Sequence, residues 1–264
     1  MTRSKRRRIF TGAAVALAAL GAIWVMFWSP VLDLREVRVL GARYTETEDI
    51  VSAAGLDRSG RNILLLSTSD IAEDVERLPW IHEAKVDRML PGTVRVRVEE
   101  RRPALTLSLE SSRWTIDLHG NVLQEGVVDR KLPVLAGVEV GDLESGVRLQ
   151  TEEAVDAVNA YRSLAGPIRA RVVAIFAPTI ERITFTLSDG SSIRFGAAEH
   201  LAAKNSVLKS LLQKLRREGR TAEYIDVRVP TSPAVSVASP TPPASPTPGA
   251  VPSSASSPLP SPSP

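Results

Sequence analysis

The chain of 264 residues contains no cysteine. Disulfide bonds, thiol nucleophiles and thiolate metal sites are therefore excluded. Histidine is scarce, with three isolated residues and no pair at the spacing of a zinc-binding helix. The sequence also has no Gly-x-Ser-x-Gly motif and no glycine-rich phosphate loop. We therefore identify no catalytic, cofactor-binding or metal-binding residue and predict a protein without cofactors that is not an enzyme.

A basic groove with interleaved aromatic residues, the pattern of a nucleic-acid site, is also missing. Aromatic residues make up only 5% of the chain. Five of the 33 Lys and Arg residues lie within the first eight positions, which leaves 28 basic against 30 acidic side chains in the remainder. The small positive net charge thus comes from a short segment, 1–8, that we expect in the cytoplasm, and we predict no nucleic-acid partner.

Ionisable groups are absent from residues 9–28, a run of apolar and small side chains. A helix of that length spans roughly 30 Å, the thickness of the hydrocarbon core of a bilayer. The basic segment before it predicts a cytoplasmic N-terminus, with everything after Ser29 outside. A cleaved signal peptide is the alternative, because small residues around Ala19 and Gly21 resemble a cleavage site. The run exceeds the usual apolar core of such a peptide, so we favour a transmembrane helix over 9–28.

Residues 34–102 alternate between strand and helix patterns in the order strand, helix, helix, strand, strand. Thr45 and Glu48 have the spacing of a capping box, and Asp70 begins a second acidic helix start. Strands with two helices on one face form a small α/β layer. The residues expected on the sheet side of its core are Val37, Val39, Val86, Val94, Val96 and Val98.

The segment 81–99 has the period-two pattern of a β-hairpin. Its turn is Leu90-Pro91-Gly92-Thr93, in which we expect Gly92 to take a positive φ. The segment also carries many charged side chains and His82. We interpret them as the solvated face of the hairpin, in preference to an acid–base site.

Beyond Ala104 the pattern is dominated by short strands, with helices expected at 151–164 and 201–215. Asp117 and Asp189-Gly190 suit turns. The last strand is expected at 222–230. One side of the second helix is cationic, and we interpret it as solvent-exposed, with contact to anionic lipid as the alternative. That side comprises Lys204, Lys209, Lys214, Arg216 and Arg217.

The composition changes abruptly after the expected last strand. Twelve of the 19 prolines lie from Pro230 onward, and residues 231–264 contain no charged side chain. Such a composition cannot bury enough apolar surface to offset the entropy of ordering. We predict a disordered Pro/Ser/Ala-rich tail over 239–264.

Several of these motifs together resemble the FtsQ/DivIB family of bacterial cell-division proteins. In the first half they are VRVLG at 37–41, GRNILLLS at 60–67, the LPWIHEAKVDRMLPGTVRVRV run and EERRPA at 99–104. In the second half they are the Asp-x-x-Gly-x-Val-Leu hairpin at 117–123, the LPVLAG segment and Ile-Asp-Val-Arg at 225–228. The resemblance implies an α+β protein with a transmembrane helix, a POTRA domain over 33–102, an FtsQ-type β domain with two helices over 103–238, and the tail.

The same resemblance implies a function. The expected protein is a non-enzymatic, single-pass scaffold of the divisome in the bacterial plasma membrane, with its C-terminus outside, at the division septum. Its implied partners are coiled-coil division proteins of the FtsB/DivIC and FtsL types, which it links to septal peptidoglycan synthase components. Carried over by position, the partner-binding residues are Tyr224, Ile225, Val227, Val229, Ser232, Ala234 and Val235. Val227 is the position we expect to disrupt binding without disturbing the fold.

Two other functions have different requirements. A POTRA-containing assembly or secretion factor acting on polypeptides would need further POTRA repeats or a C-terminal barrel. A membrane-tethered wall hydrolase would need converging carboxylates or metal ligands. The sequence displays none of these features, so we favour the scaffold.

Overall fold

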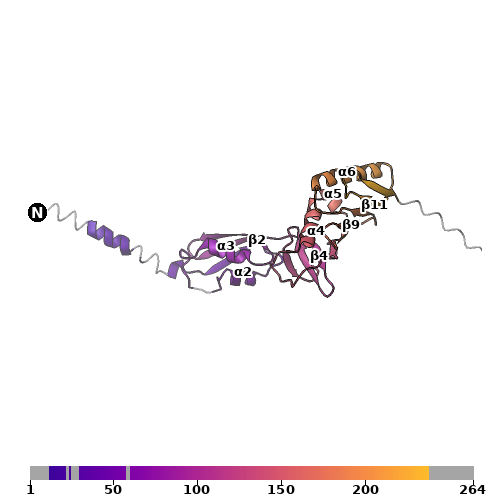
Figure 1. Ribbon diagram of the computed structural model, residues 1–264. Helices are drawn as coiled ribbons and strands as arrows, with labels where there is room; N and C mark the ends of the chain where they lie inside the picture. Colours follow the sequence, from indigo (N-terminus) through magenta and orange to yellow (C-terminus); the bar gives the residue numbers. More distant parts are fainter. Residues whose placement is uncertain (1–11, 22–23, 25–29, 58–59, 238–264) are drawn as a thin grey trace, which may run out of the picture.

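The computed structural model describes residues 12–21, 24, 30–57 and 60–237. In this part of the chain, Figure 1 shows two lobes that follow one another along the sequence, each built around its own β-sheet. The predicted cytoplasmic segment 1–8 and the predicted disordered tail 239–264 lie outside the described residues. The two lobes make the protein a mixed α+β structure, as predicted.

The transmembrane helix expected over 9–28 is wrong. Of the residues expected in this helix, the structure describes 12–21 and Trp24, and these are helical. In the described part of the chain, no helix combines the length and the apolar character that crossing a membrane requires.

The first lobe contains a three-stranded sheet and two α-helices. Its strands lie in the order β1-β3-β2, with β1 parallel to β3 and β2 antiparallel to β3. The chain order, strand, helix, helix, strand, strand, is the predicted one. The element bounds are η1 Pro30–Leu32, β1 Glu36–Leu40, α2 Thr47–Ala53, α3 Thr68–Glu76, β2 Ile81–Met89 and β3 Thr93–Glu100.

The valines of β3 form the sheet side of this lobe's core. Val94, Val96 and Val98 are buried, because alternate side chains of a strand point to the same face. Ile50 of α2 and Val75 of α3 are fully buried in the same cluster. The remaining predicted core valines pack against it half-buried: Val37, Val39 and Val86.

Two local predictions in this lobe are wrong. The hairpin turn has a cis Leu90–Pro91 bond, and Gly92 does not take a positive φ. Instead, a side chain at Gly92 would meet the backbone oxygen of Asp33 at 2.6 Å, so the close passage of the chain requires the glycine. The capping box also fails, because α2 begins after Glu46 without a side-chain cap.

Thr45, the expected cap, is held by a different group. The carboxylate of Glu100, at the end of β3, accepts hydrogen bonds from the backbone N of Tyr44 at 3.0 and 2.9 Å and of Thr45 at 2.8 Å. The ring of Tyr44 stacks on Trp80 with 4.4 Å between centroids. Burial raises the pKa of Glu100, but the backbone donors outweigh it and hold the pKa below the usual 4.5.

We expect Glu100→Gln to lower the free energy of unfolding by about 1–2 kcal/mol at neutral pH, because a charge-assisted acceptor becomes neutral. The folded state favours the carboxylate, so its contribution is full above pH 4.5 and is lost as the pH falls through the lower folded-state pKa. Urea unfolding at pH 7 and at lower pH measures this difference. A gap between the two proteins that stays constant as the pH falls below 4.5 would contradict the assignment.

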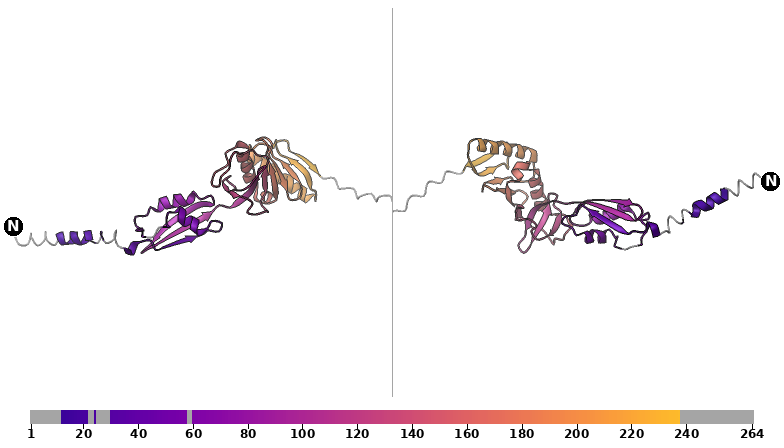
Figure 2. Two further views of the ribbon diagram at one scale, coloured as in Figure 1. Left: turned by 90° about the horizontal axis from the view of Figure 1, so that it is seen from below. Right: turned by 180° about the vertical axis from the view of Figure 1, so that it is seen from behind.

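The second lobe contains a nine-stranded sheet and three helices. The strand order is β12-β11-β10-β9-β8-β7-β4-β5-β6. Figure 2 shows the last strand, in yellow, at the border of the sheet away from the first lobe. The bounds are β4 Pro103–Ser108, β5 Arg113–Asp117, β6 Val122–Glu125, β7 Val134–Ala136, α4 Glu152–Ser163, α5 Gly166–Arg169, β8 Val172–Phe176, β9 Thr184–Leu187, β10 Ser192–Arg194, α6 Leu201–Arg217, β11 Ala222–Asp226 and β12 Ala234–Val237.

The helices of this lobe differ from the prediction in two ways. The helix expected over 151–164 ends before Gly166-Pro167, as predicted, but these two residues also begin the one-turn α5, which was not predicted. Proline loses no hydrogen bond there, because first-turn N–H groups have no partner in the helix. Lys204 of α6, expected on the wet face, is only 2% exposed. Its Nζ donates to the backbone oxygens of Phe195 at 2.9 Å and Ala197 at 2.7 Å.

Asp117 organises the turn between β5 and β6, as predicted. Its Oδ1 accepts from the backbone N of His119 at 2.7 Å and of Asn121 at 2.9 Å, and its Oδ2 accepts from the Asn121 side chain at 2.7 Å. Arg101, in the short link between the lobes, donates to Oδ2 at 3.3 Å. This buried carboxylate thus fixes the start of the second lobe relative to the end of β3.

Candidate functional site

The predicted partner-binding residues gather at one border of the nine-stranded sheet. Tyr224 and Ile225 lie in β11, and Ala234 and Val235 lie in the adjacent antiparallel strand β12. Ile225 pairs with Val235 in the register. The other three predicted residues, Val227, Val229 and Ser232, lie in the connection between the two strands.

The expected edge strand is not at the edge. β11, which we expected to end the sheet, lies between β10 and β12. Its backbone groups are therefore used on both sides. In the described part of the chain, β12 pairs only with β11, so its other side presents backbone N–H and C=O groups without a neighbouring strand.

The opposite border of the sheet is covered by the chain itself. The backbone N of Val122, in β6, donates to Val147 O at 2.8 Å, and Gly146 N donates to Val122 O at 2.8 Å. Asn121 forms an isolated bridge with Arg148. Segment 146–148 thus completes β6, and β12 is the more open border for an added strand.

The register decides which backbone groups of β11 face which neighbour. The backbone N of Val227 donates to Arg194 O at 3.0 Å, and Arg194 lies opposite Asp226 in the parallel pairing with β10. In a parallel ladder one residue bonds to the two residues that flank its partner. Ile225 and Val227 therefore direct their backbone groups to β10, and Tyr224 and Asp226 direct theirs to β12.

The same alternation continues into β12. Ala234 lies opposite Asp226, and Ser236 lies opposite Tyr224, so these two residues exchange hydrogen bonds with β11. Val235, between them, has its N–H and C=O directed away from β11. The geometry thus identifies Val235 as the residue of β12 whose main chain is available to an incoming strand.

Burial divides the seven predicted residues into two groups. Ile225 and Val227 are both 0% exposed and belong to the core, so their side chains position the border and do not reach a partner. Val227 is therefore a poor test position, because a charge there would disrupt the core. Val229 is 57% exposed, and Tyr224 and Val235 are half-buried. The remaining exposed residues are Ser232 and Ala234.

Charged groups surround Tyr224 on this border. The guanidinium of Arg194 lies 4.0 Å from the centroid of the Tyr224 ring. Arg228 donates to Asp226 through its Nη2 at 2.7 Å, its Nε at 3.0 Å and its backbone N at 3.1 Å. These hydrogen bonds lower the pKa of Asp226 and outweigh its partial burial. The carboxylate stays ionised, and the border presents a fixed set of donors and acceptors.

Sequence reasoning missed two parts of this border. β12 was missed because Pro230 and Pro233 mark the start of a proline-rich segment. The available signal was the apolar residue at every second position, Val235 and Val237. Arg194 was missed because its proximity to Tyr224 depends on a parallel pairing between distant segments.

Comparison with family models matches both lobes. Residues 32–101 match the FtsQ-type POTRA domain, and residues 110–228 match the C-terminal domain of cell division protein FtsQ/DivIB. The second match ends before β12, so the open border extends beyond the matched region. The predicted domain bounds 33–102 and 103–238 stay predictions.

Three curated relatives carry the name cell division protein FtsQ. The protein of Corynebacterium glutamicum is 24% identical over 80% of this chain and 91% of its own length. That of Streptomyces bingchenggensis is 27% identical over 89% and 88%, and that of Mycobacteroides abscessus is 28% identical over 82% and 66%. The solved extracytoplasmic domain of the division protein DivIB of Geobacillus stearothermophilus aligns with 45% of this chain and 97% of its own length at 16% identity and a TM-score of 0.31, too low to support a structural argument.

Proposed function

The chain belongs to the FtsQ/DivIB family of bacterial cell-division proteins, and from that premise we propose that it is a non-enzymatic scaffold of the divisome. Its relatives are named as cell division protein FtsQ. The proposed site of action is the division septum, on the outer side of the plasma membrane. There the protein holds coiled-coil partners of the FtsB/DivIC and FtsL types and links them to septal peptidoglycan synthesis.

The observation that supports this proposal is the open border at β12. An extended segment of a partner gains main-chain hydrogen bonds by adding a strand next to β12, and side-chain contacts give selectivity. The partner strand pairs with Val235 and lies beside the charged group around Tyr224. In this proposal the exposed and half-buried residues among the seven contact the partner, and the buried Ile225 and Val227 support the strands that do.

We expect a photo-reactive amino acid at Val229 to crosslink to the FtsB/DivIC-type protein encoded in the same genome. Val229 is exposed and follows β11, so a probe there reaches the border without entering the core. The measurement is crosslinking in dividing cells with the full chain, followed by identification of the crosslinked peptide by mass spectrometry. The matched control is a probe at the exposed Val173 of β8, in the middle of the same sheet.

A crosslink to the FtsB/DivIC-type protein from Val229 and not from Val173 would support the proposal. Equal yields from both positions would show proximity without a defined border and would contradict the proposal. The absence of a crosslink to a coiled-coil division protein would also contradict the proposal. Release of peptidoglycan fragments by the purified full chain would contradict the non-enzymatic part.

A further inference from the structure

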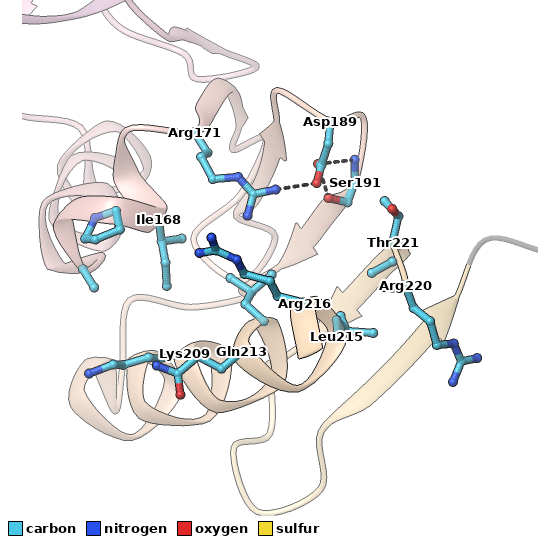
Figure 3. A pocket seen from close by; sticks show the side chains of 14 residues that line it. Ile168, Arg171, Asp189, Ser191, Lys209, Gln213, Leu215, Arg216, Arg220 and Thr221 are labelled. Carbon is cyan, nitrogen blue, oxygen red and sulfur yellow. Dashed lines mark hydrogen bonds and ion pairs between the residues drawn. The ribbon is translucent and has the colours of Figure 1, made fainter. Parts of the chain in front are cut away.

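A cavity of about 660 Å³ lies in the second lobe, away from the side chains that we assign to the open border. It is formed by α5, the C-terminal half of α6, the turn between β9 and β10, and the start of β11. Figure 3 shows α6 below the cavity and the β9–β10 turn above it. Its apolar lining includes Ile168, Leu212 and Leu215. The volume lies within the range of cavities that bind ligands or anchoring side chains.

Basic side chains surround this apolar lining. The lining includes Arg171, Lys209, Arg216 and Arg220, and only one acidic residue, Asp189. Arg171 already forms an ion pair with Asp189. The Nη1 of Arg220 lies 3.6 Å from Oε2 of Glu218 in a second ion pair. In Figure 3 the Arg220 side chain points away from the cavity.

Two of these cations have no acidic partner among the described residues. Within the described ranges, neither Lys209 nor Arg216 forms a hydrogen bond or an ion pair through its side chain. Figure 3 shows the Arg216 side chain extending toward Arg171 and Asp189, across the cavity. The cavity mouth therefore has an excess of positive charge that no group of the described chain neutralises.

The spacing of these cations follows one side of α6. Lys209, Gln213 and Arg216 are four and three residues apart, which places them on one face of the helix. Lys209 and Arg216 are thus separated by two turns, or roughly 10 Å along the axis. Leu212, on the same part of the helix, contributes to the apolar lining.

We propose that this cavity is a second docking site, which takes an acidic amphipathic α-helix of a partner protein. An apolar side chain of that helix enters between Ile168 and Leu215, and two carboxylates seven residues apart face Lys209 and Arg216. Two helices that lie alongside each other have the same rise per residue, so both ion pairs form together. The class of partner, a helical protein, rests on the proposed scaffold function, and the position and charge of the docking site do not.

An anionic lipid fits these observations less well. A lipid headgroup concentrates its negative charge at one point, whereas the two unpaired cations are roughly 10 Å apart along α6. Two separated carboxylates on a peptide complement this pattern better. The favoured ligand is therefore a protein segment.

The test uses the purified full chain and a designed peptide of roughly 15 residues, long enough for helix formation. The peptide has leucines along one side and two glutamates seven residues apart, and a second peptide has lysines in place of the glutamates. Fluorescence anisotropy measures the binding of each. We expect the acidic peptide to bind and the basic one to bind at least tenfold more weakly.

Two charge-reversal variants locate the site. Lys209→Glu with Arg216→Glu should weaken binding of the acidic peptide at least tenfold. The matched control, Lys214→Glu with Arg217→Glu, makes the same change of net charge on exposed residues of the same helix outside the cavity lining, and it should weaken binding less than threefold. Circular dichroism checks that both variants keep the helix content of the parent.

Equal losses in the two variants, or no binding of the acidic peptide, would overturn the second docking site. It would also be overturned if vesicles with anionic phospholipid displaced the peptide from the parent chain and bound the cavity variant more weakly than the control. None of these results bears on the β12 border, because crosslinking from Val229 is measured separately. Conversely, loss of the Val229 crosslink leaves the peptide experiment unaffected.

Discussion

Val235→Pro in the full chain is expected to weaken binding of the FtsB/DivIC-type partner at least tenfold while the second lobe stays folded. The register directs the N–H of Val235 away from β11, so proline removes a donor that only an incoming strand uses. Proline is tolerated in edge strands where the missing N–H faces solvent. Calorimetric titration of the purified chains measures the affinity.

Ser236→Pro is the matched control for this experiment. It makes the same chemical change one residue later, where the N–H points to Tyr224 of β11. We expect it to break the pairing of the two strands and to increase hydrogen exchange at Tyr224 and Asp226. Val235→Pro should leave the exchange of these amides unchanged.

The pair of variants separates a docking role from a structural one. If Val235→Pro binds the partner like the parent chain, strand addition at β12 is excluded as the main contact. If it exposes the amides of β11 as much as Ser236→Pro does, the register that we assign to β12 is incorrect. Either outcome would remove the structural support for the proposed border.

The second large effect is expected at Lys204. Replacement by alanine should lower the free energy of unfolding by about 2–4 kcal/mol, because it leaves a cavity and deprives one buried and one partly buried carbonyl group of their donor. Those groups are the backbone oxygens of Phe195 and Ala197. Chemical denaturation of the full chain, followed through the second lobe, measures the loss. Lys209→Ala on the exposed side of the same helix is the control and should change stability by less than 0.5 kcal/mol.

The pH dependence of this contribution has a defined sign. Burial lowers the pKa of Lys204 below the usual 10.5, and the charge of Glu199 opposes the shift only in part. The unfolded chain therefore binds more protons between the folded-state pKa and pH 10.5, and this lysine increases stability as the pH rises through that window. The alanine variant should lack that increase. A variant with the parent's stability at pH 7 would show that the two carbonyl groups find other donors.

Local pattern in the sequence predicted much of the first lobe and parts of the second. The alternation of Val94, Val96 and Val98 predicted a half-buried strand, and the structure buries all three. Asp117 was predicted to organise a turn because its carboxylate reaches nearby backbone N–H groups, and it does so. Both predictions succeeded because the interacting groups lie within a few residues of one another.

The same local reasoning failed where the outcome depended on length or on neighbours. The apolar run at 9–28 suggested a membrane-spanning helix, but no helix in the described part of the chain has the length and apolar character for one. Lys204 has the residue type of an exposed helix face, yet a loop after β10 surrounds it with acceptors. Neither fact follows from the periodicity of the segment.

The order of strands and helices in the first lobe, the turn at Asp117 and membership of a cell-division family follow from the amino-acid sequence alone. The strand that borders the sheet, the N–H of that strand that faces outward and the position of the cavity beside α6 follow only from the folded structure. The physical reason is that side-chain periodicity is set by bonds between neighbouring residues, whereas strand order depends on pairing between distant segments. The parallel pairing of β10 with β11 places β12 at the border, and no local pattern contains that pairing.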